Sequence, residues 1–141
     1  MNIIQKIISI TRKTRGFHII TNEIYKDIPE IATIKKGICL LFLLHTSASL
    51  SINENADPTV RTDMERFFNR TVPENEALYE HTYEGPDDMT SHIKTSILGT
   101  SLTIPITNGC FVLGTWQGIY LCEHRNKASS RSISVTIVGE E

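Results

Sequence analysis

Residue types that carry metal-binding or proton-transfer chemistry gather in four short stretches of this sequence. The stretches cover residues 45–48, residues 53–58, residues 81–92 and residues 116–125, and they contain imidazole, carboxylate, amide, indole and guanidinium groups. Each stretch falls where we expect a strand to end or a helix to begin, and such positions present functional side chains on a rigid scaffold. The four stretches are therefore the candidate site.

One stretch combines imidazole and carboxylate groups at a spacing that suits a metal ion. Asp88 and His92 stand four residues apart and share one face of an expected helix, while His81 precedes that helix by a short connection. Nitrogen and oxygen donors of this kind bind zinc, manganese, nickel or cobalt. The sequence has no HExxH or CxxC spacing, so the pattern indicates a metal site without specifying the metal.

The same residues also have structural interpretations. Asp57 suits the cap of a helix, Asp88 favours a helix N-terminus through its charge, and Trp116 suits a hydrophobic core. His18 lies in an apolar segment and is interpreted as structural, and the three cysteines are interpreted as buried and unreactive. No GxSxG, Walker or GxGxxG motif selects a reaction among these possibilities.

Length and composition limit the class of protein. The chain has 141 residues, which suits one domain spanning residues 1–141, and its 14 Lys and Arg against 16 Asp and Glu give a net charge of −2. This balance excludes a general electrostatic interaction with nucleic acid. The longest apolar run, at residues 38–44, is far shorter than the roughly 20 residues of a membrane span. With no signal-peptide layout and an odd number of cysteines, the sequence predicts a cytoplasmic domain.

Two helices are predicted by signals at their ends. The first covers residues 58–71, because Asp57 can cap it and Pro73 follows its last turn. The second covers residues 86–98, with a glycine on either side and an apolar stripe formed by Met89, Ile93 and Ile97. A third helix over residues 23–34 is interrupted by Pro29.

The remaining segments are rich in β-branched and apolar residues and predict strands. They cover residues 2–10, 17–21, 38–45, 48–53, 102–107, 110–113, 117–124 and 132–138. The continuous apolar run at residues 38–45 predicts a strand covered on both faces, and Asn108-Gly109 predicts a tight hairpin. Many strands, several of them antiparallel, together with two or three helices indicate an α+β fold.

Six motifs of this chain resemble those of the YjbQ-like family, whose members are described as secondary thiamine-phosphate synthases. They are HTSA at residues 45–48, NENADP at 53–58, EGPDDM at 84–89, HIK at 92–94, LTIP at 102–105 and GTWQGIYLCEHR at 114–125. The resemblance extends from about residue 21 to residue 138, with the motifs in the same order. It implies a single α+β domain with β-sandwich-like sheets, assembled as a homotrimer.

The resemblance also implies an activity and a set of metal ligands. The expected reaction joins hydroxymethylpyrimidine pyrophosphate to thiazole phosphate and releases pyrophosphate, an activity regarded as secondary in the family. Three residues match histidine positions of the family and are the expected ligands of a divalent metal, either zinc or magnesium/manganese: His45, His81 and His92. Glu123 matches an acidic position of the last motif.

The chemistry of the side chains suggests their roles in that reaction. His45 or Glu123 would move protons, with Asp88 as a further catalytic group. Cationic groups would hold the phosphates and the indole would stack on the pyrimidine. The expected substrate-binding residues are Asn53, Asp57, Lys94, Trp116 and Arg125. The expected partners are small phosphorylated molecules and further copies of this chain.

Two other functions are compatible with the same residues. A metal-dependent hydrolase or phosphate-ester enzyme would use the three histidines and Asp88 to activate water. A non-catalytic trimeric protein would bind a metabolite or a metal ion. An enzyme is favoured because unpaired charge is costly in so small a domain, and the polar clusters are numerous.

Overall fold

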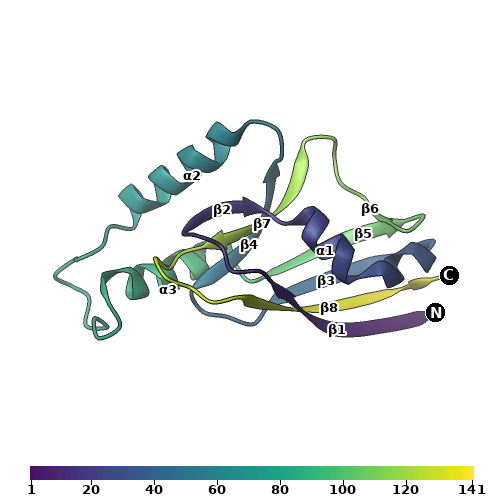
Figure 1. The fold of residues 1–141 in the computed structure, drawn as a ribbon, viewed down its shortest axis with the longest axis horizontal. Helices are drawn as coiled ribbons and strands as arrows, with labels where there is room; N and C mark the ends of the chain where they lie inside the picture. The colour runs from purple at the N-terminus through teal and green to yellow at the C-terminus, as the bar shows by residue number, and fades with distance from the viewer.

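Two antiparallel sheets, three α-helices and one 3₁₀ helix make up the computed structural model, which describes all 141 residues (Figure 1). The five-stranded sheet contains, in spatial order, β1 (Asn2–Ile10), β8 (Arg131–Glu140), β3 (Lys36–Leu43), β5 (Ser101–Thr107) and β6 (Cys110–Phe111). The three-stranded sheet contains β2 (Gly16–Ile19), β7 (Gln117–Glu123) and β4 (Ala48–Glu54). The helices are α1 (Thr21–Asp27), the 3₁₀ helix η1 (Pro29–Thr33), α2 (Pro58–Thr71) and α3 (Pro86–Leu98). The predicted α+β fold is confirmed.

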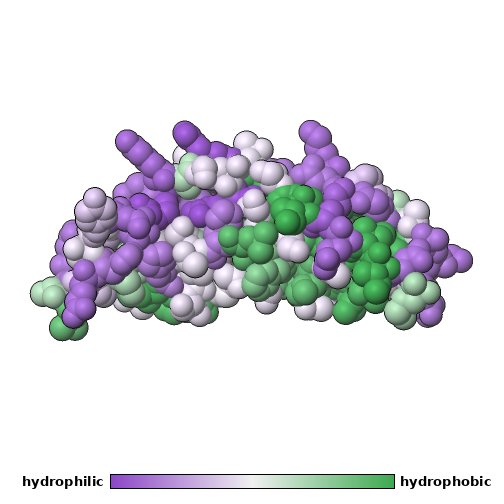
Figure 2. All heavy atoms as spheres, turned by 90° about the horizontal axis from the view of Figure 1, so that it is seen from below, coloured by the Kyte–Doolittle hydropathy of each residue, from purple (hydrophilic) through white to green (hydrophobic).

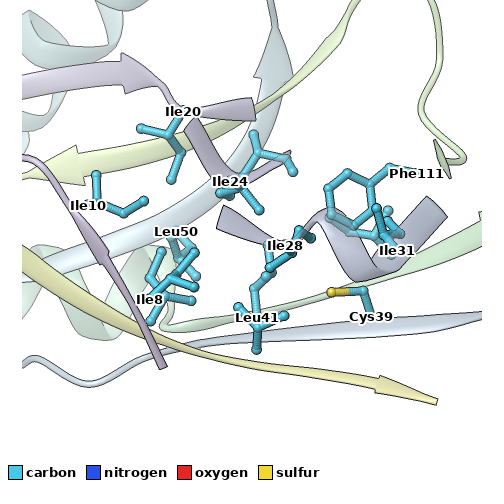
Figure 3. Packing of buried hydrophobic residues seen from close by; sticks show 14 of the residues in the cluster. Ile8, Ile10, Ile20, Ile24, Ile28, Ile31, Cys39, Leu41, Leu50 and Phe111 are labelled. Carbon is cyan, nitrogen blue, oxygen red and sulfur yellow. The ribbon is translucent and has the colours of Figure 1, made fainter. Parts of the chain in front are cut away.

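The main hydrophobic core lies between the five-stranded sheet and a second layer made by the three-stranded sheet with α1 and η1. Figure 3 shows the side chains of Ile24, Ile28 and Ile31 above Leu41 and Cys39 of β3. Each fully buried aliphatic side chain stabilises the fold by about 1.5 to 3 kcal/mol. This layer therefore fixes the position of one sheet, and of its strand ends, relative to the other sheet.

A smaller cluster covers the other face of the three-stranded sheet. Phe17 of β2 stacks on Phe68 of α2 with ring centroids 5.9 Å apart, and Tyr120 of β7 meets Phe17 edge-on at 6.4 Å. Helix α3 lies against β4 beside this cluster. The two long helices are thereby fixed against the strands whose ends carry the candidate site residues.

Helix α2 has the bounds that its sequence predicts. Asp57 Oδ1 accepts hydrogen bonds from the backbone nitrogen of Thr59 at 2.9 Å and from its Oγ1 at 2.8 Å. These bonds lower the pKa of the Asp57 carboxyl. Pro58 takes the first helical position, where its missing N–H has no cost. The interpretation of Asp57 as a helix cap is confirmed.

Helix α3 also has its predicted bounds, but the predicted apolar stripe is wrong. Ile97 is 58% exposed, and the buried face is mainly polar. Its hydroxyl groups find acceptors on the sheet: Ser91 Oγ donates to the carbonyl of His124 at 2.9 Å, and Thr95 Oγ1 donates to that of Ala48 at 3.1 Å. Because buried polar groups are tolerated when they are hydrogen-bonded, this face can pack against β4 and the residue that follows β7.

The apolar run predicted that both faces of β3 would be covered, but within one chain only one face is covered. Its residues alternate between buried and exposed, because α1, η1 and the three-stranded sheet cover the inner face of the five-stranded sheet and no element covers its outer face. Figure 2 views the molecule from below and shows green hydrophobic side chains gathered on this face, with purple ones along the margins. We call this surface the apolar sheet face; its large side chains are Ile3, Ile7, Ile38, Leu40, Phe42 and Leu44.

Most short-range predictions are confirmed. Asn108 and Gly109 have φ values of 51° and 77°, and they form the tight turn between β5 and β6.

Cys39 and Cys122 are buried, and burial raises the pKa of each thiol to about 12. Cys110 is exposed, because it follows the turn at the sheet edge, so its predicted burial is wrong. No helix is long and apolar enough to cross a membrane.

Candidate functional site

Three donor groups converge near the start of α3. Asp88 Oδ2 lies 2.6 Å from His81 Nε2 and 3.1 Å from His92 Nε2. The three ligand atoms all lie within 4.8 Å of one another, and we call the three residues the His–Asp cluster. The Asp88 side chain is 3% exposed, whereas those of His81 and His92 are 47% and 30% exposed. The cluster is therefore anchored on one side and open to solvent on the other.

The second ring nitrogen of His92 is held by the backbone. Nδ1 lies 2.8 Å from the carbonyl oxygen of Thr46. A carbonyl can only accept, so Nδ1 donates to it, and Nε2 is the ring nitrogen that faces Asp88. Metal-binding histidines are commonly oriented by a backbone carbonyl in this way. The donor chemistry of the cluster therefore fits a divalent metal ion.

Arg125 holds the other side of the Asp88 carboxylate. Its Nη1 lies 2.5 Å from Asp88 Oδ1, and its Nε lies 2.9 Å from Asp87 Oδ2. Burial acts to raise the pKa of Asp88, but the hydrogen bond from His81 and the charges of His92 and Arg125 lower that pKa overall. The carboxylate is therefore ionised at neutral pH. Arg125, predicted as a phosphate contact, is engaged by the two carboxylates.

His45 lies beside the cluster but is not a member of it. Its Nε2 accepts a hydrogen bond from the backbone nitrogen of Ser132 at 2.8 Å, so the neutral ring carries its proton on Nδ1. Burial and then the charge of Arg131 lower the pKa of His45, which is neutral at pH 7. His45 and His92 line one hollow of about 470 Å³, together with Thr46, Thr95, Ser96 and Thr100. Within one chain, the group of three possible metal ligands is therefore His81, Asp88 and His92, and His45 is outside it.

Two further predicted site residues are buried in polar networks. Glu123 has no exposed surface, and its carboxylate pairs with Arg131 through Oε1–Nε at 2.7 Å and Oε2–Nη2 at 2.5 Å. Lys94 is 1% exposed, and its Nζ donates to Asn69 Oδ1 at 2.8 Å. Burial and then the charge of Arg15 lower the pKa of Lys94. Neither Glu123 nor Lys94 lines the hollow beside the cluster.

The remaining predicted residues lie at the opposite end of the three-stranded sheet. Strand β4 runs from Ala48, near the cluster, to Glu54, near Asn53, Asp57 and Trp116. Its length separates the two ends by about 20 Å. Trp116 is 66% exposed, so it is not a core aromatic. Within one chain the predicted site residues therefore form two groups.

Three groups that support the site were not among the site residues expected from the sequence. The Thr46 carbonyl orients His92, Asp87 binds Arg125, and Arg131 pairs with Glu123. The adjacent acids at positions 87 and 88 were an available signal for the second carboxylate. The carbonyl and the ion pair have no such signal, because each depends on how separate segments pack together.

Comparison with protein families and relatives gives a consistent match. The family model described as UPF0047 protein YjbQ-like matches residues 6–140. The UPF0047 protein YjbQ of Escherichia coli O157:H7 is 55% identical over 136 residues, which cover 96% of this chain and 98% of that protein. The UPF0047 protein sll1880 of Synechocystis sp. is 43% identical, over 96% of this chain and 92% of that protein.

Solved structures share the fold along the whole chain. A protein of the yjbq/upf0047 family from Clostridium acetobutylicum superposes with a TM-score of 0.79 at 36% identity, covering 96% of this chain and 99% of that one. A YbjQ-like protein of unknown function from Sulfolobus solfataricus P2 superposes with a TM-score of 0.85 at 26% identity, covering 99% of each chain. These descriptions identify a family and assign no reaction.

Proposed function

The chain belongs to the YjbQ-like UPF0047 family, and we propose that it is a metal-dependent enzyme acting on small phosphorylated molecules. One observation carries the proposal. His92 Nδ1 is held by the Thr46 carbonyl, so Nε2 faces Asp88 Oδ2 at 3.1 Å, and a ring nitrogen and a carboxylate oxygen at this distance require a proton or a cation between them. His81 adds a second imidazole 2.6 Å from the same carboxylate oxygen.

The donor set fits a zinc-like ion better than magnesium. Two imidazoles and one carboxylate match catalytic zinc sites and also suit manganese, whereas magnesium prefers oxygen ligands. His81, Asp88 and His92 would hold such an ion. When bound, it would supply positive charge for an anionic leaving group or for activation of water.

For the reaction we propose the thiamine-phosphate synthase-like transfer that the family resemblance implies. The bond between the pyrimidine methylene and the pyrophosphate oxygen breaks, pyrophosphate leaves with the electron pair, and the thiazole nitrogen bonds to the methylene. In the hollow beside the cluster, hydroxyl groups and the Nδ1–H of His45 would donate hydrogen bonds to the departing oxygens. With Nε2 engaged by Ser132, His45 would act as a donor and not as a base.

A metal-dependent phosphate-ester hydrolase is the second candidate, and the positions of the cations favour it. Arg125 is bound by Asp87 and Asp88, and Lys94 is buried against Asn69. The lining of the hollow contains no lysine or arginine to hold a pyrophosphate group. Activation of water at the cluster needs fewer such contacts.

Metal binding tests the proposed site. Replacing Asp88 by asparagine or His92 by alanine is expected to weaken zinc binding by about 100-fold or more, because each removes a charged or direct ligand. Competition with a chromophoric chelator measures this affinity. His18→Ala is the matched control, because the His18 ring is bound to the Thr14 carbonyl outside the cluster, and it should keep the affinity of the wild type. Equal zinc affinity in all variants would rule out the metal centre.

Product analysis separates the candidate functions. With both precursors and the metal, a transferase yields thiamine phosphate and pyrophosphate. A hydrolase releases phosphate from a single precursor. A protein that binds the metal tightly but converts neither precursor would instead support a non-catalytic binding role.

We further propose that the chain assembles as the homotrimer that the family resemblance implies, and that the apolar sheet face is buried in that assembly. Six large apolar side chains on one uncovered surface are unusual for a monomer. Association would also offer a way to bring the Trp116 end of one copy near the His–Asp cluster of another. The two groups of predicted site residues would then belong to a shared site.

The quaternary structure can be tested at Phe42, which is 44% exposed within the apolar sheet face. Phe42→Glu is expected to raise the dissociation constant of the trimer by about 30-fold or more, because it buries a carboxylate at the interface. Phe67→Glu is the matched control, since Phe67 is 51% exposed but lies on α2. Sedimentation equilibrium measures the mass, and a wild-type mass of 15.9 kDa would contradict the trimer.

A further inference from the structure

A second hollow, of about 440 Å³, lies between β2 and the first half of α2. Helix α2 runs beside this strand in Figure 1. The charged side chains that line the hollow are Arg15, Arg61, Arg66 and Glu65, so the lining has a net charge of +2. No residue of the His–Asp cluster contributes to it. The hollow is therefore a separate, positively charged feature of the surface.

The single carboxylate in this hollow is already neutralised. Glu65 Oε1 lies 3.2 Å from Arg15 Nε and accepts a hydrogen bond from Asn69 Nδ2 at 3.0 Å. Arg15 also pairs with Glu74 at 2.6 Å through Nη1. Arg15 and Glu65 thus satisfy each other, and the remaining positive charge comes from Arg61 and Arg66.

Arg61 has an unmet hydrogen-bonding requirement. Its Nη1 is buried and has no hydrogen-bond partner, and no other buried side-chain nitrogen or oxygen of the protein is in this state. Native structures rarely leave a buried donor unpaired, because the group loses its contacts with water and gains none in return. The charge of Asp57 acts on Arg61, but Asp57 gives this nitrogen no acceptor. A small rotation of the guanidinium would expose Nη1 to the hollow, where a bound anion would supply the missing acceptor.

We propose that this hollow binds the phosphate group of a small phosphorylated molecule, with Arg61 as its principal contact and Arg66 as a second. The planar guanidinium offers paired N–H donors that match the oxygens of a phosphate group. The volume of the hollow is within the range of small-ligand sites. Because no residue of the His–Asp cluster lines the hollow, phosphate binding there does not depend on the proposed metal centre.

Inorganic phosphate is the probe for this site, titrated calorimetrically into the full chain after treatment with EDTA. Arg61→Gln is expected to weaken phosphate binding by about tenfold or more, because it removes charge-assisted hydrogen bonds. Arg70→Gln is the matched control, since Arg70 lies on the same helix but does not line the hollow, and it should change the affinity by less than about twofold. Should Arg61→Gln fail to fold, Arg66→Gln provides the same test with a smaller expected loss.

Three results would overturn the proposal. The first is equal phosphate affinity in the wild type and in Arg61→Gln. The second is loss of phosphate binding on EDTA treatment or in Asp88→Asn, which would assign the phosphate to the His–Asp cluster. The third is equal affinity for succinate, which would show an unselective basic surface. Phosphate binding that survives in Asp88→Asn and fails in Arg61→Gln supports the separate site, whatever the metal experiments show.

Discussion

Replacing Glu123 by alanine is expected to lower the free energy of unfolding by about 3 to 5 kcal/mol. The Glu123 carboxylate has no exposed surface and binds Arg131 through two hydrogen bonds, at 2.7 and 2.5 Å. The Arg131 side chain is only 8% exposed, so the variant leaves a buried guanidinium without its counter-charge. Urea unfolding measures the loss as a shift of the transition midpoint.

The same ion pair positions one wall of the hollow beside the cluster. Arg131 Nη2 donates to the Ser47 carbonyl at 3.2 Å, and the backbone nitrogen of the following residue, Ser132, donates to His45 Nε2. In folded Glu123→Ala, the imidazole resonances of His45 are therefore expected to shift in NMR spectra. This link gives Glu123 a positioning role, in place of the proton-transfer role that the sequence suggested.

The double variant Glu123→Leu with Arg131→Met is the matched control. It removes both charges and fills a similar volume, and replacement of a buried ion pair by apolar side chains is often neutral or stabilising. It should therefore recover most of the stability that Glu123→Ala loses. A loss below about 1 kcal/mol in the single variant would contradict the importance of the pair.

Acidification is expected to destabilise the protein through His124, by about 3 kcal/mol between pH 7 and pH 4.5. The His124 ring is 1% exposed, and its Nε2 lies 2.8 Å from Ser49 Oγ. Burial, followed by the charges of Lys94, Arg15 and Arg131, lowers the pKa of His124 to about 3. Its pKa in the unfolded chain is about 6.5.

The sign of this effect follows from proton binding. Between pH 6.5 and pH 3 the unfolded chain binds a proton at His124 that the folded protein excludes, so stability falls as the pH falls through this window. Above it, His124 is neutral in both states and contributes no pH dependence. His124→Gln keeps a hydrogen-bonding group but cannot titrate, so its stability should change by about 3 kcal/mol less between the two pH values. Urea unfolding of both proteins measures the difference, and parallel pH profiles would exclude His124 as the cause.

Elements with strong local signals were predicted closely from the sequence. Helix α2 begins after Asp57 and ends before Pro73, and the turn at Asn108-Gly109 joins β5 to β6. A cap, a proline or a residue with positive φ acts within a few bonds of its own position, so its effect can be read without knowing the fold.

The buried face of α3 was not predictable in this way. Ser91 is buried because it bonds to the carbonyl of His124, and Thr95 because it bonds to that of Ala48. These acceptors lie 33 and 47 residues away along the chain. An amphipathic pattern assumes that apolar residues face the core, and it fails when the sheet offers hydrogen-bond acceptors instead.

Local spacing along the chain was enough to predict the α+β fold, most element boundaries and the placement of Asp88 and His92 on one helical turn. The folded protein shows that Asp88 joins His81 and His92, whereas His45 bonds to Ser132. It also shows that Glu123 pairs with Arg131 and that Trp116 lies at the far end of the sheet. These outcomes depend on strand register and on the packing of α3 against β4. Both are set by contacts between segments distant along the chain, and no local pattern records them.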